Sequence, residues 1–478
     1  MGFGLGPWAA PLLMRRTGAT QRLKRIVRAA GGVLIDAASS ELYIERSSPT
    51  TVAAVGDPVG TIVDPVSGLT FVPPTDAARA VLRREPVGGV RNLLARTEEF
   101  DNAYWDKANA TVSQVDGPAW SLTAEAGTDI VPAIRRSGDV GPVDTWRIGS
   151  VEIRPQGHSR FVCAFNSTLN NNNAAGGATV VELTGAGSVV ATVANDAQVE
   201  PLEGGWYRVT ILRNGTGFGT PRRFAVSIAR PDATSPDDVA WSPTGGEGGE
   251  IRFPQYESVE DDATLSARTP YQRVGNANDI TEAGVPSVLY LRGDGIDDGY
   301  RSTADFNPGA TDKLFALCAV RKRSDDATGV LVETAANSGN ADGSFIFVHS
   351  WSAGDAQQRT WQSGTRGSNP RNRRTGRIYP APDLAVIDAA FDHSAATTAA
   401  QNVFLRNGAE MDGYDNAGPT GAGNFQPHRL NLLARNNADR LFAAADCHLL
   451  AILPGATTEA TRDAIRRIAA HRIGVTLP

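Results

Sequence analysis

The sequence predicts a mostly β protein: two antiparallel β-sandwich domains of the jelly-roll type, after a short N-terminal anchor helix and a connector. Three observations support this fold class. Short apolar or alternating runs of strand length recur about every 10–20 residues, with Gly, Asn and Pro between them. Only two stretches have helical periodicity, one near each end of the chain. The length of 478 residues is enough for about three domains of roughly 150 residues.

Residues 1–32 are predicted to be a basic N-terminal anchor segment. Residues 1–35 contain no acid, although the whole chain has a net charge of −6. The spacing predicts a helix over 20–30, with Thr20 as its cap and Gly31 after its end. We expect this segment to dock onto an acidic protein partner; a helix on a membrane surface and a solvated helix are the alternatives. Its basic residues are Arg15, Arg16, Arg22, Lys24, Arg25 and Arg28.

Two further segments follow the anchor. Residues 33–90 contain short extended runs broken by Pro and Gly, and we expect a compact connector rather than a domain. Residues 91–274 are predicted to form the first sandwich, because each strand of such a fold needs one buried face and a turn to reverse. Its strand-like runs are 146–155, 160–167, 178–185, 188–194, 205–214, 222–231 and 249–257.

Residues 275–478 are predicted to form a second jelly roll. Asn407–Gly408 is the strongest hairpin signal, because both residues of a type I′ turn have positive φ. A helix is expected to begin after the cap Thr458 and to end at Gly474, covering the sandwich. The strand-like runs are 287–293, 313–322, 329–334, 343–351, 384–392, 402–411, 428–435 and 447–455.

Composition excludes several classes of protein. No apolar run approaches the roughly 20 residues of a membrane helix. The apolar N-terminus carries its charges after the apolar stretch, so we expect no export signal. Cys163, Cys318 and Cys447 form no CxxC pair. This argues against a disulfide framework or a zinc site and favours assembly in a reducing cytoplasm.

Several stretches resemble known domains. NLLARTEEFDNAYWDKANATV (92–112), EGGWYRVTI (203–211) and residues 251–275 are similar to carbohydrate-binding-like β-sandwich domains of tailed-phage fibre and spike proteins. LYLRGDGIDDGY (289–300), together with the 402–411 hairpin and the C-terminal helix, resembles a concanavalin-like, laminin-G-type jelly roll. In phage fibres, a segment similar to 42–68 commonly precedes that jelly roll.

The resemblance implies a virion surface protein, a head or tail fibre or spike of a tailed phage or a gene transfer agent. Such a protein is assembled in the bacterial cytoplasm and is attached through its N-terminus to capsid, portal or tail proteins. Its implied ligand is host capsule or lipopolysaccharide. A homo-oligomer is also implied, with a trimer expected. We expect neither nucleic acid nor a membrane as a partner.

Motifs of catalysis and of cofactor binding are missing from the sequence. The E-x-D-x-x-E pattern of hydrolytic jelly rolls, H-E-x-x-H and G-x-S-x-G do not occur. We therefore expect no enzymatic activity, no cofactor and no metal. The acids Asp294, Asp297 and Asp298 are interpreted as turn residues. Calcium is the alternative, although the spacing is not that of a D-x-D-x-D-G loop.

The candidate glycan-binding site is a loop expected between Trp351 and Tyr379. Aromatic faces there could stack on a sugar, and guanidinium groups could pair with the anions of an acidic glycan. The alternatives are that the tryptophans are core residues and that the basic run is a solvated loop. The predicted site residues are Trp351, Trp361, Arg366, Arg371, Arg373, Arg374, Arg377 and Tyr379.

Together these features predict a non-catalytic adhesin that attaches a phage-like particle to host polysaccharide. A glycan-degrading tail spike and a purely structural capsid or tail decoration protein are the alternatives.

Overall fold

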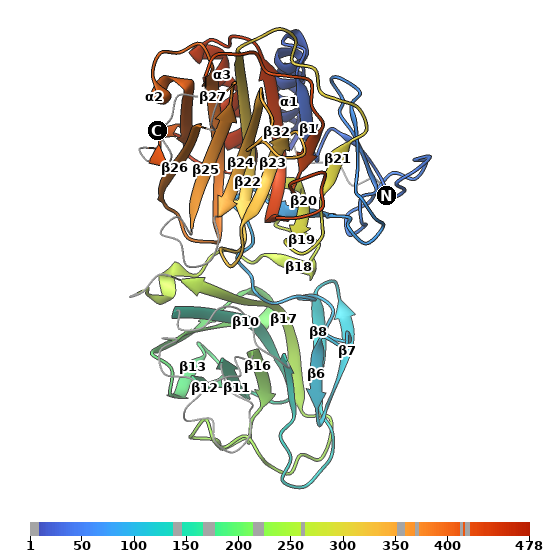
Figure 1. Ribbon diagram of the computed structural model, residues 1–478. Helices are drawn as coiled ribbons and strands as arrows, with labels where there is room; N and C mark the ends of the chain where they lie inside the picture. Colours follow the sequence, from blue (N-terminus) through green and yellow to red (C-terminus); the bar gives the residue numbers. More distant parts are fainter. Residues whose placement is uncertain are drawn as a thin grey trace. The chain divides into compact units, whose positions relative to one another are not determined.

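The computed structural model confirms the predicted fold class, because antiparallel strands are the dominant secondary structure of its described residues (Figure 1). It divides into two compact units, which we describe separately: unit 1 is Met1–Gly89 with Pro286–Pro478, and unit 2 is Val90–Val285. The structure describes residues 9–136, 146–165, 177–213, 224–259, 263–350, 359–368, 372–411, 414–415 and 421–478.

Unit 2 is a sandwich of two six-stranded antiparallel sheets in its described residues. One sheet has the order β14-β15-β10-β17-β8-β7, and we call it the pocket sheet. Its strands are β7 (Ala110–Asp116), β8 (Ala119–Ala124), β10 (Trp146–Gln156), β14 (Asp196–Pro201), β15 (Tyr207–Arg213) and β17 (Gly248–Val259).

The other sheet of unit 2 has the order β13-β12-β11-β16-β9-β6. The large side chains of Trp105, Phe161 and Tyr256 fill the space between the two sheets. Unit 2 also holds two short 3-10 helices, η1 (Glu203–Gly205) and η2 (Leu265–Ala267), and the hairpin of β18 (Arg273–Asn276) and β19 (Asp279–Thr281). The strands of the second sheet are β6 (Trp105–Ala108), β9 (Ala133–Arg136), β11 (Arg160–Phe165), β12 (Ala178–Glu182), β13 (Ser188–Thr192) and β16 (Phe224–Ile228).

Unit 1 is a larger sandwich, and helices cover one of its sheets. This helix-covered sheet contains the order β5-β20-β32-β22-β27-β28-β29, and β1 pairs with β32. The predicted type I′ hairpin is confirmed, because Asn407 and Gly408 have φ of 50° and 80° between β28 and β29. The strands are β1 (Val33–Asp36), β5 (Val81–Pro86), β20 (Ser287–Asp294), β22 (Lys313–Lys322), β27 (Asp383–Asp392), β28 (Asn402–Arg406), β29 (Ala409–Glu410) and β32 (Ala444–Pro454).

The partner sheet of unit 1 has the order β2-β3-β4-β21-β31-β23-β24-β25-β26-β30. Buried side chains such as Phe71, Phe347 and Leu450 form one core between the two sheets. A one-turn helix, α2 (Thr398–Gln401), precedes β28. The strands are β2 (Glu41–Tyr43), β3 (Thr61–Val63), β4 (Thr70–Val72), β21 (Tyr300–Ser302), β23 (Gly329–Thr334), β24 (Ser344–Ser350), β25 (Thr360–Arg366), β26 (Asn372–Ile378), β30 (Tyr414–Asp415) and β31 (Leu430–Leu432).

The structure corrects the expected connector and domain boundary. Residues 33–90 contribute β1 to β5, which belong to both sheets of unit 1. Unit 2 is therefore inserted within unit 1, and residues 275–285 group with unit 2 rather than with the second jelly roll. The sequence hides this arrangement because strands of three to six residues between Pro and Gly turns carry almost no periodicity. They become strands only through hydrogen bonds to partners distant in the chain.

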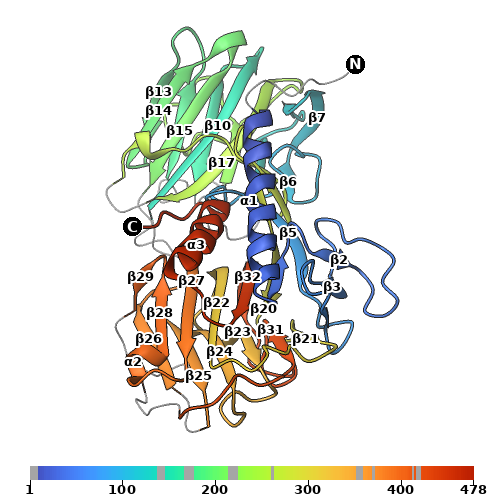
Figure 2. The same cartoon turned by 90° about the horizontal axis from the view of Figure 1, so that it is seen from above.

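The N-terminal helix α1 (Ala9–Ala29) is longer than expected, and its last turns pack onto unit 1. Figure 2 shows α1 beside α3 (Glu459–Ile473) on the helix-covered sheet. Leu23 and Val27 are fully buried in the cluster beneath both helices. This part of the anchor segment is thus a structural layer of unit 1. No helix in the described part of the chain has the length and apolar character needed to cross a membrane.

Basic residues of α1 remain on its outer side. Arg22, Arg25 and Arg28 are exposed, and Arg28 also donates to the Pro65 carbonyl. Lys24 is half-buried and donates to the Ser39 carbonyl at 3.4 Å. Arg15 and Arg16 lie within α1, but their side chains are outside the described part of the structure.

The C-terminal helix α3 matches its prediction in detail. The Thr458 side chain accepts a hydrogen bond from the Thr461 amide, and Gly474 ends the helix with a φ of 79°. A left-handed residue at this position suits glycine, because it lacks a Cβ. The buried faces of Ile465, Ala469 and Ile473 hold α3 against the sheet.

Candidate functional site

Trp361, one of the predicted glycan-binding residues, is a core residue of unit 1. Its side chain has no exposed surface and packs into the core between the two sheets. Its Nε1 donates to an Oδ2 of Asp383 at 2.6 Å. The prediction that Trp361 stacks on a ligand is therefore wrong, because a fully buried ring has no free face. The alternative, a core tryptophan, is correct for this residue.

Tyr379 is half-buried beside the same internal polar group. The Arg406 guanidinium lies over its ring at 3.9 Å and pairs with Asp383. The buried Lys322 ammonium donates to the carbonyls of Tyr379 and Arg359, at 2.5 and 3.1 Å. The structure thus brings Trp361 and Tyr379 together, but around side chains that satisfy one another rather than around an opening.

The expected arginine loop is largely a β-hairpin. Strands β25 and β26 pair in antiparallel fashion, and β26 also pairs with β30. Arg366, at the end of β25, pairs with Asp342 at 3.0 Å and donates to the Gly339 carbonyl. The other candidates fall on parts that are not described: Trp351 and Arg371 entirely, and the side chains of Arg373, Arg374 and Arg377 in β26.

The acids Asp294, Asp297 and Asp298 form a turn after β20, as the sequence analysis favoured. One oxygen of Asp294 accepts the backbone amides of Ile296, Asp297 and Asp298, and Asp298 accepts the Asp294 amide. Carboxylate oxygens of the three acids lie within 4.8 Å of one another. Burial, with the nearby Asp294 carboxylate, raises the pKa of Asp298 to about 6. Calcium binding there stays the alternative to the turn interpretation.

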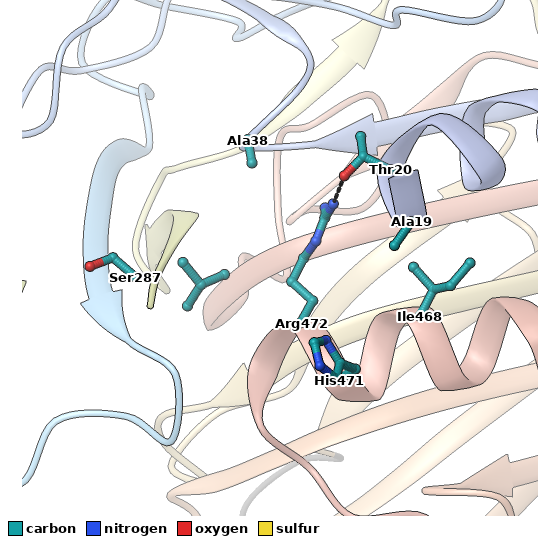
Figure 3. A pocket seen from close by; sticks show the side chains of 8 residues that line it. Ala19, Thr20, Ala38, Ser287, Ile468, His471 and Arg472 are labelled. Atoms are coloured by element: carbon teal, nitrogen blue, oxygen red, sulfur yellow. Dashed lines mark hydrogen bonds between the residues drawn. The ribbon is translucent and has the colours of Figure 1, made fainter. Parts of the chain in front are cut away.

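A small pocket in unit 1 lies between α1, α3 and the start of β20 (Figure 3). Its volume is about 110 Å³, and its walls include Ile468, Ala38 and Val288. The one cation that lines it, Arg472, donates to the Thr20 hydroxyl at 2.8 Å and pairs with the buried Asp36. The internal partners of Arg472 leave this pocket without a free charged group.

A larger pocket opens on the outward face of the pocket sheet in unit 2, and the sequence analysis missed it. Its volume is about 350 Å³. Strand alternation explains its floor: Val151 and Val209 point into the core, so Ser150, Glu152 and Arg208 lie on the opposite face. We call it the Arg268 pocket, and its lining residues are Ser150, Glu152, Arg208, Phe253, Arg268, Pro270 and Tyr271.

A β-bulge in β17 places the aromatic wall of this pocket. The register between β10 and β17 shifts between Ser150 and Glu152, and Phe253 has a φ of 53°. Such a φ is unusual for a residue with a large side chain, and bulges of this kind re-aim side chains. The ring of Phe253 lies 4.6 Å from that of Tyr271, with an interplanar angle of 42°. Both residues are partly exposed and line the pocket.

The segment that carries Arg268, Pro270 and Tyr271 is fixed to the sheet by side chains of β17. Glu257 accepts the Thr269 hydroxyl at 2.5 Å, and Gln255 donates to Thr269 and to the Pro270 carbonyl. The Tyr271 hydroxyl donates to Thr97 at 2.7 Å, and burial raises the pKa of Tyr271. These bonds give the pocket wall a defined position.

The charged side chains of the pocket differ in whether they form ion pairs. Glu152 is buried and accepts from Arg208 at 2.7 Å and from Arg252 at 2.8 Å. Arg208 also pairs with Glu200. Arg268, in contrast, forms no ion pair with any described residue; its one hydrogen bond goes to the Thr269 carbonyl at 3.0 Å. Burial and the neighbouring Arg208 guanidinium lower the pKa of Arg268.

Two signals in the sequence could have indicated this pocket. Polar residues alternate with apolar ones in Ser150-Val151-Glu152-Ile153-Arg154, which places a charged row on one face of a central strand. The segment 251–275, which resembles part of carbohydrate-binding-like domains, holds Phe253, Arg268 and Tyr271 close together in the sequence. The bulge at Phe253 has no signal of its own, because it depends on the register between β10 and β17.

No model of a known protein family matches the sequence, and no curated protein sequence does. Similar solved structures include the Ruminococcus gnavus IT-sialidase CBM40 bound to α2,3-sialyllactose, with 10% identity, coverage of 38% of this chain and 97% of that chain, and a TM-score of 0.26. Trypanosoma rangeli sialidase is 10% identical, with coverage of 93% of this chain and 72% of that chain and a TM-score of 0.27. Mouse laminin α1 domains LG4–5 are 10% identical, with coverage of 73% of this chain and 93% of that chain and a TM-score of 0.24. Such low similarity assigns no family to the chain.

Proposed function

We propose that this protein is a non-catalytic adhesin on the surface of a phage-like particle, a head or tail fibre or spike that binds host polysaccharide. The observation that carries this proposal is the Arg268 pocket, an open hollow with an aromatic wall and a polar floor. A sugar presents apolar C–H faces and many hydroxyl groups. Ring surface at Phe253 and Tyr271 suits the C–H faces, and Ser150 offers a hydrogen-bond partner for a sugar hydroxyl group.

The carboxyl groups among the described lining residues of the pocket fit binding better than cleavage. Glycoside hydrolysis uses two carboxyl groups, one of which must carry a proton. Glu152 is the one carboxylate among the described lining residues, and it accepts hydrogen bonds from two guanidinium groups, so these residues do not supply a pair of carboxyl groups. A glycan-degrading spike remains the second candidate function, and a structural decoration protein the third.

Attachment to the particle is proposed through α1. Its apolar face is buried within unit 1, so the exposed Arg22, Arg25 and Arg28 form the surface that an acidic capsid, portal or tail protein would contact. The preceding turns hold Arg15 and Arg16. A homo-oligomer, with a trimer as the leading expectation, would present several weak glycan sites at once and so strengthen attachment.

The test is retention of the full-length protein on purified host capsule or lipopolysaccharide. The Phe253→Ala variant should be retained at least about tenfold more weakly, because burying a phenylalanine ring contributes about 1.5–3 kcal/mol. Val115→Ala, which also removes exposed apolar surface from unit 2 but on β7, is the matched control. Normal retention of a folded Phe253→Ala variant would place the site elsewhere.

Three further measurements separate the alternatives. The combined Arg371→Ala, Arg373→Ala and Arg374→Ala variant tests the site predicted around β26, and weaker retention of this variant alone would favour that site. Release of reducing sugar ends from the polysaccharide would favour the glycan-degrading spike. Absence of retention, with normal incorporation into particles, would favour structural decoration.

A further inference from the structure

We infer that the Arg268 pocket selects a sugar that carries a carboxylate, such as a uronic or nonulosonic acid, and that Arg268 pairs with this group. The inference rests on the proposed glycan-binding function and adds the chemical class of the ligand. Its starting point is the contrast between Arg268 and the other arginines around the pocket.

The neighbouring arginines already have carboxylate partners. Glu152 pairs with both Arg208 and Arg252, and Glu200 adds a second partner for Arg208. The Arg252 guanidinium also lies 4.0 Å from the centre of the Trp206 ring. These groups form the scaffold of the pocket, because their hydrogen-bonding capacity is directed at one another.

Arg268 is left out of this network although it is partly buried. Its one hydrogen bond, to the Thr269 carbonyl, uses a single N–H of a group that has five. Glu257 is close enough to influence its pKa, but the oxygens of Glu257 accept from Gln255 and Thr269 instead. A desolvated guanidinium beside another guanidinium is unfavourable without an anion, and none of the described residues forms an ion pair with Arg268.

The shape of the pocket favours a carboxylate on a sugar over a free anion. Arginine binds carboxylates through two parallel N–H donors, and the same pocket has aromatic surface at Phe253 and Tyr271 for an apolar face. Its volume of about 350 Å³ suits a short segment of a glycan chain rather than a single small ion. Ser150 on the floor can form a hydrogen bond with a sugar hydroxyl group and so orient the acid toward Arg268.

The experiment compares three probes on the full-length protein by calorimetry: a hexuronic acid oligosaccharide, the same oligosaccharide after reduction of its carboxylates to alcohols, and a sulfated neutral oligosaccharide. The acidic probe should bind at least about tenfold more tightly than the reduced one, because hydrogen bonds to charged groups are the strong ones. Arg268→Gln should remove this preference, so that the variant binds the acidic probe no more tightly than the reduced one.

The control variant is Arg230→Gln, which neutralises another partly exposed arginine of unit 2 that pairs with Asp232. It should keep the wild-type preference. Arg268→Lys keeps the charge but not the paired donors, and we expect a partial loss. Melting temperatures of all variants verify that they are folded.

Each outcome decides the inference. Equal affinity for the acidic and reduced probes, with both weakened by Phe253→Ala, overturns the carboxylate selection but keeps the glycan-binding pocket. Preference for the sulfated probe replaces the carboxylate by a sulfate ester. Binding of no probe, in a protein that also fails to be retained on host polysaccharide, overturns the proposed function and this inference together.

Discussion

The Trp361 region of unit 1 and the Arg268 pocket of unit 2 contain the same kinds of side chain, yet only one is open to a ligand. Around Trp361, Lys322 donates to two carbonyls and pairs with Asp325, and Arg406 pairs with Asp383. In the Arg268 pocket, one guanidinium lacks such a partner. Buried cations need partners, and when the chain supplies them no group remains for a ligand. Aromatic and basic composition alone therefore does not identify a binding site.

Substitution of Trp361 tests the difference between the two regions most directly. Trp361→Ala should lower the free energy of unfolding of unit 1 by about 3–5 kcal/mol, because it leaves a cavity in the core. Affinity for glycan at the Arg268 pocket should not change while the protein is folded. Denaturation followed by hydrogen exchange in peptides of each unit measures both units separately. A stable variant with reduced glycan binding would restore Trp361 as a ligand contact.

Helix α1 also has a buried face, which includes Leu23, and an exposed face, which includes Arg22 and Arg25. Leu23→Ala should lower the free energy of unfolding of unit 1 by about 2–5 kcal/mol, since Leu23 is fully buried beneath the helix. Arg22→Ala combined with Arg25→Ala should change it by less than about 0.5 kcal/mol, because both residues are exposed. Incorporation into particles should fall in the double arginine variant and should change less in a folded Leu23→Ala variant. If the leucine variant were as stable as the wild type, α1 would be an arm that does not contribute to the core.

Acidification should weaken unit 1 through His349. Burial, followed by the nearby Lys322 ammonium, lowers the pKa of His349 to about 4. In the unfolded chain the imidazole takes up its proton near pH 6.5, so the free energy of unfolding falls between pH 6.5 and pH 4, by about 3 kcal/mol for this group. The stability difference between the wild type and His349→Gln should therefore shrink as the pH falls.

Two observations check this pH dependence. The same substitution at the exposed His471 should keep the wild-type profile. A constant difference between wild type and His349→Gln from pH 7 to pH 4 would mean that His349 is not held neutral in the folded protein.

The smallest expected effect is at Arg366, whose ion pair with Asp342 lies near the surface. Arg366→Ala should change stability by less than about 1 kcal/mol, because exposed pairs contribute little. It should leave the affinity for the carboxylate probe unchanged, in contrast to Arg268→Gln. A tenfold loss of affinity in the Arg366 variant would move the acidic-glycan site to unit 1.

Most of the fold could be predicted from the sequence because its longer strands stand out as apolar or alternating runs between turn residues. The runs 313–322 and 447–455 match β22 and β32 closely, and the ends of α3 follow from Thr458 and Gly474. The insertion of unit 2 could not be predicted in this way. It depends on strands such as β3 and β4, which have three residues each and owe their place to distant partners.

The candidate site separates the two kinds of information further. The sequence by itself determined which residues can bind a glycan, since ring faces and guanidinium groups are properties of side chains. Only the tertiary structure decided which of them are free. Both faces of the Trp361 ring are buried in the core, whereas Arg268 has N–H donors without hydrogen-bond partners among the described residues. The bulge at Phe253 likewise comes from the register of two strands. Burial and pairing are relations between residues far apart in the chain, so composition and local pattern leave them undetermined.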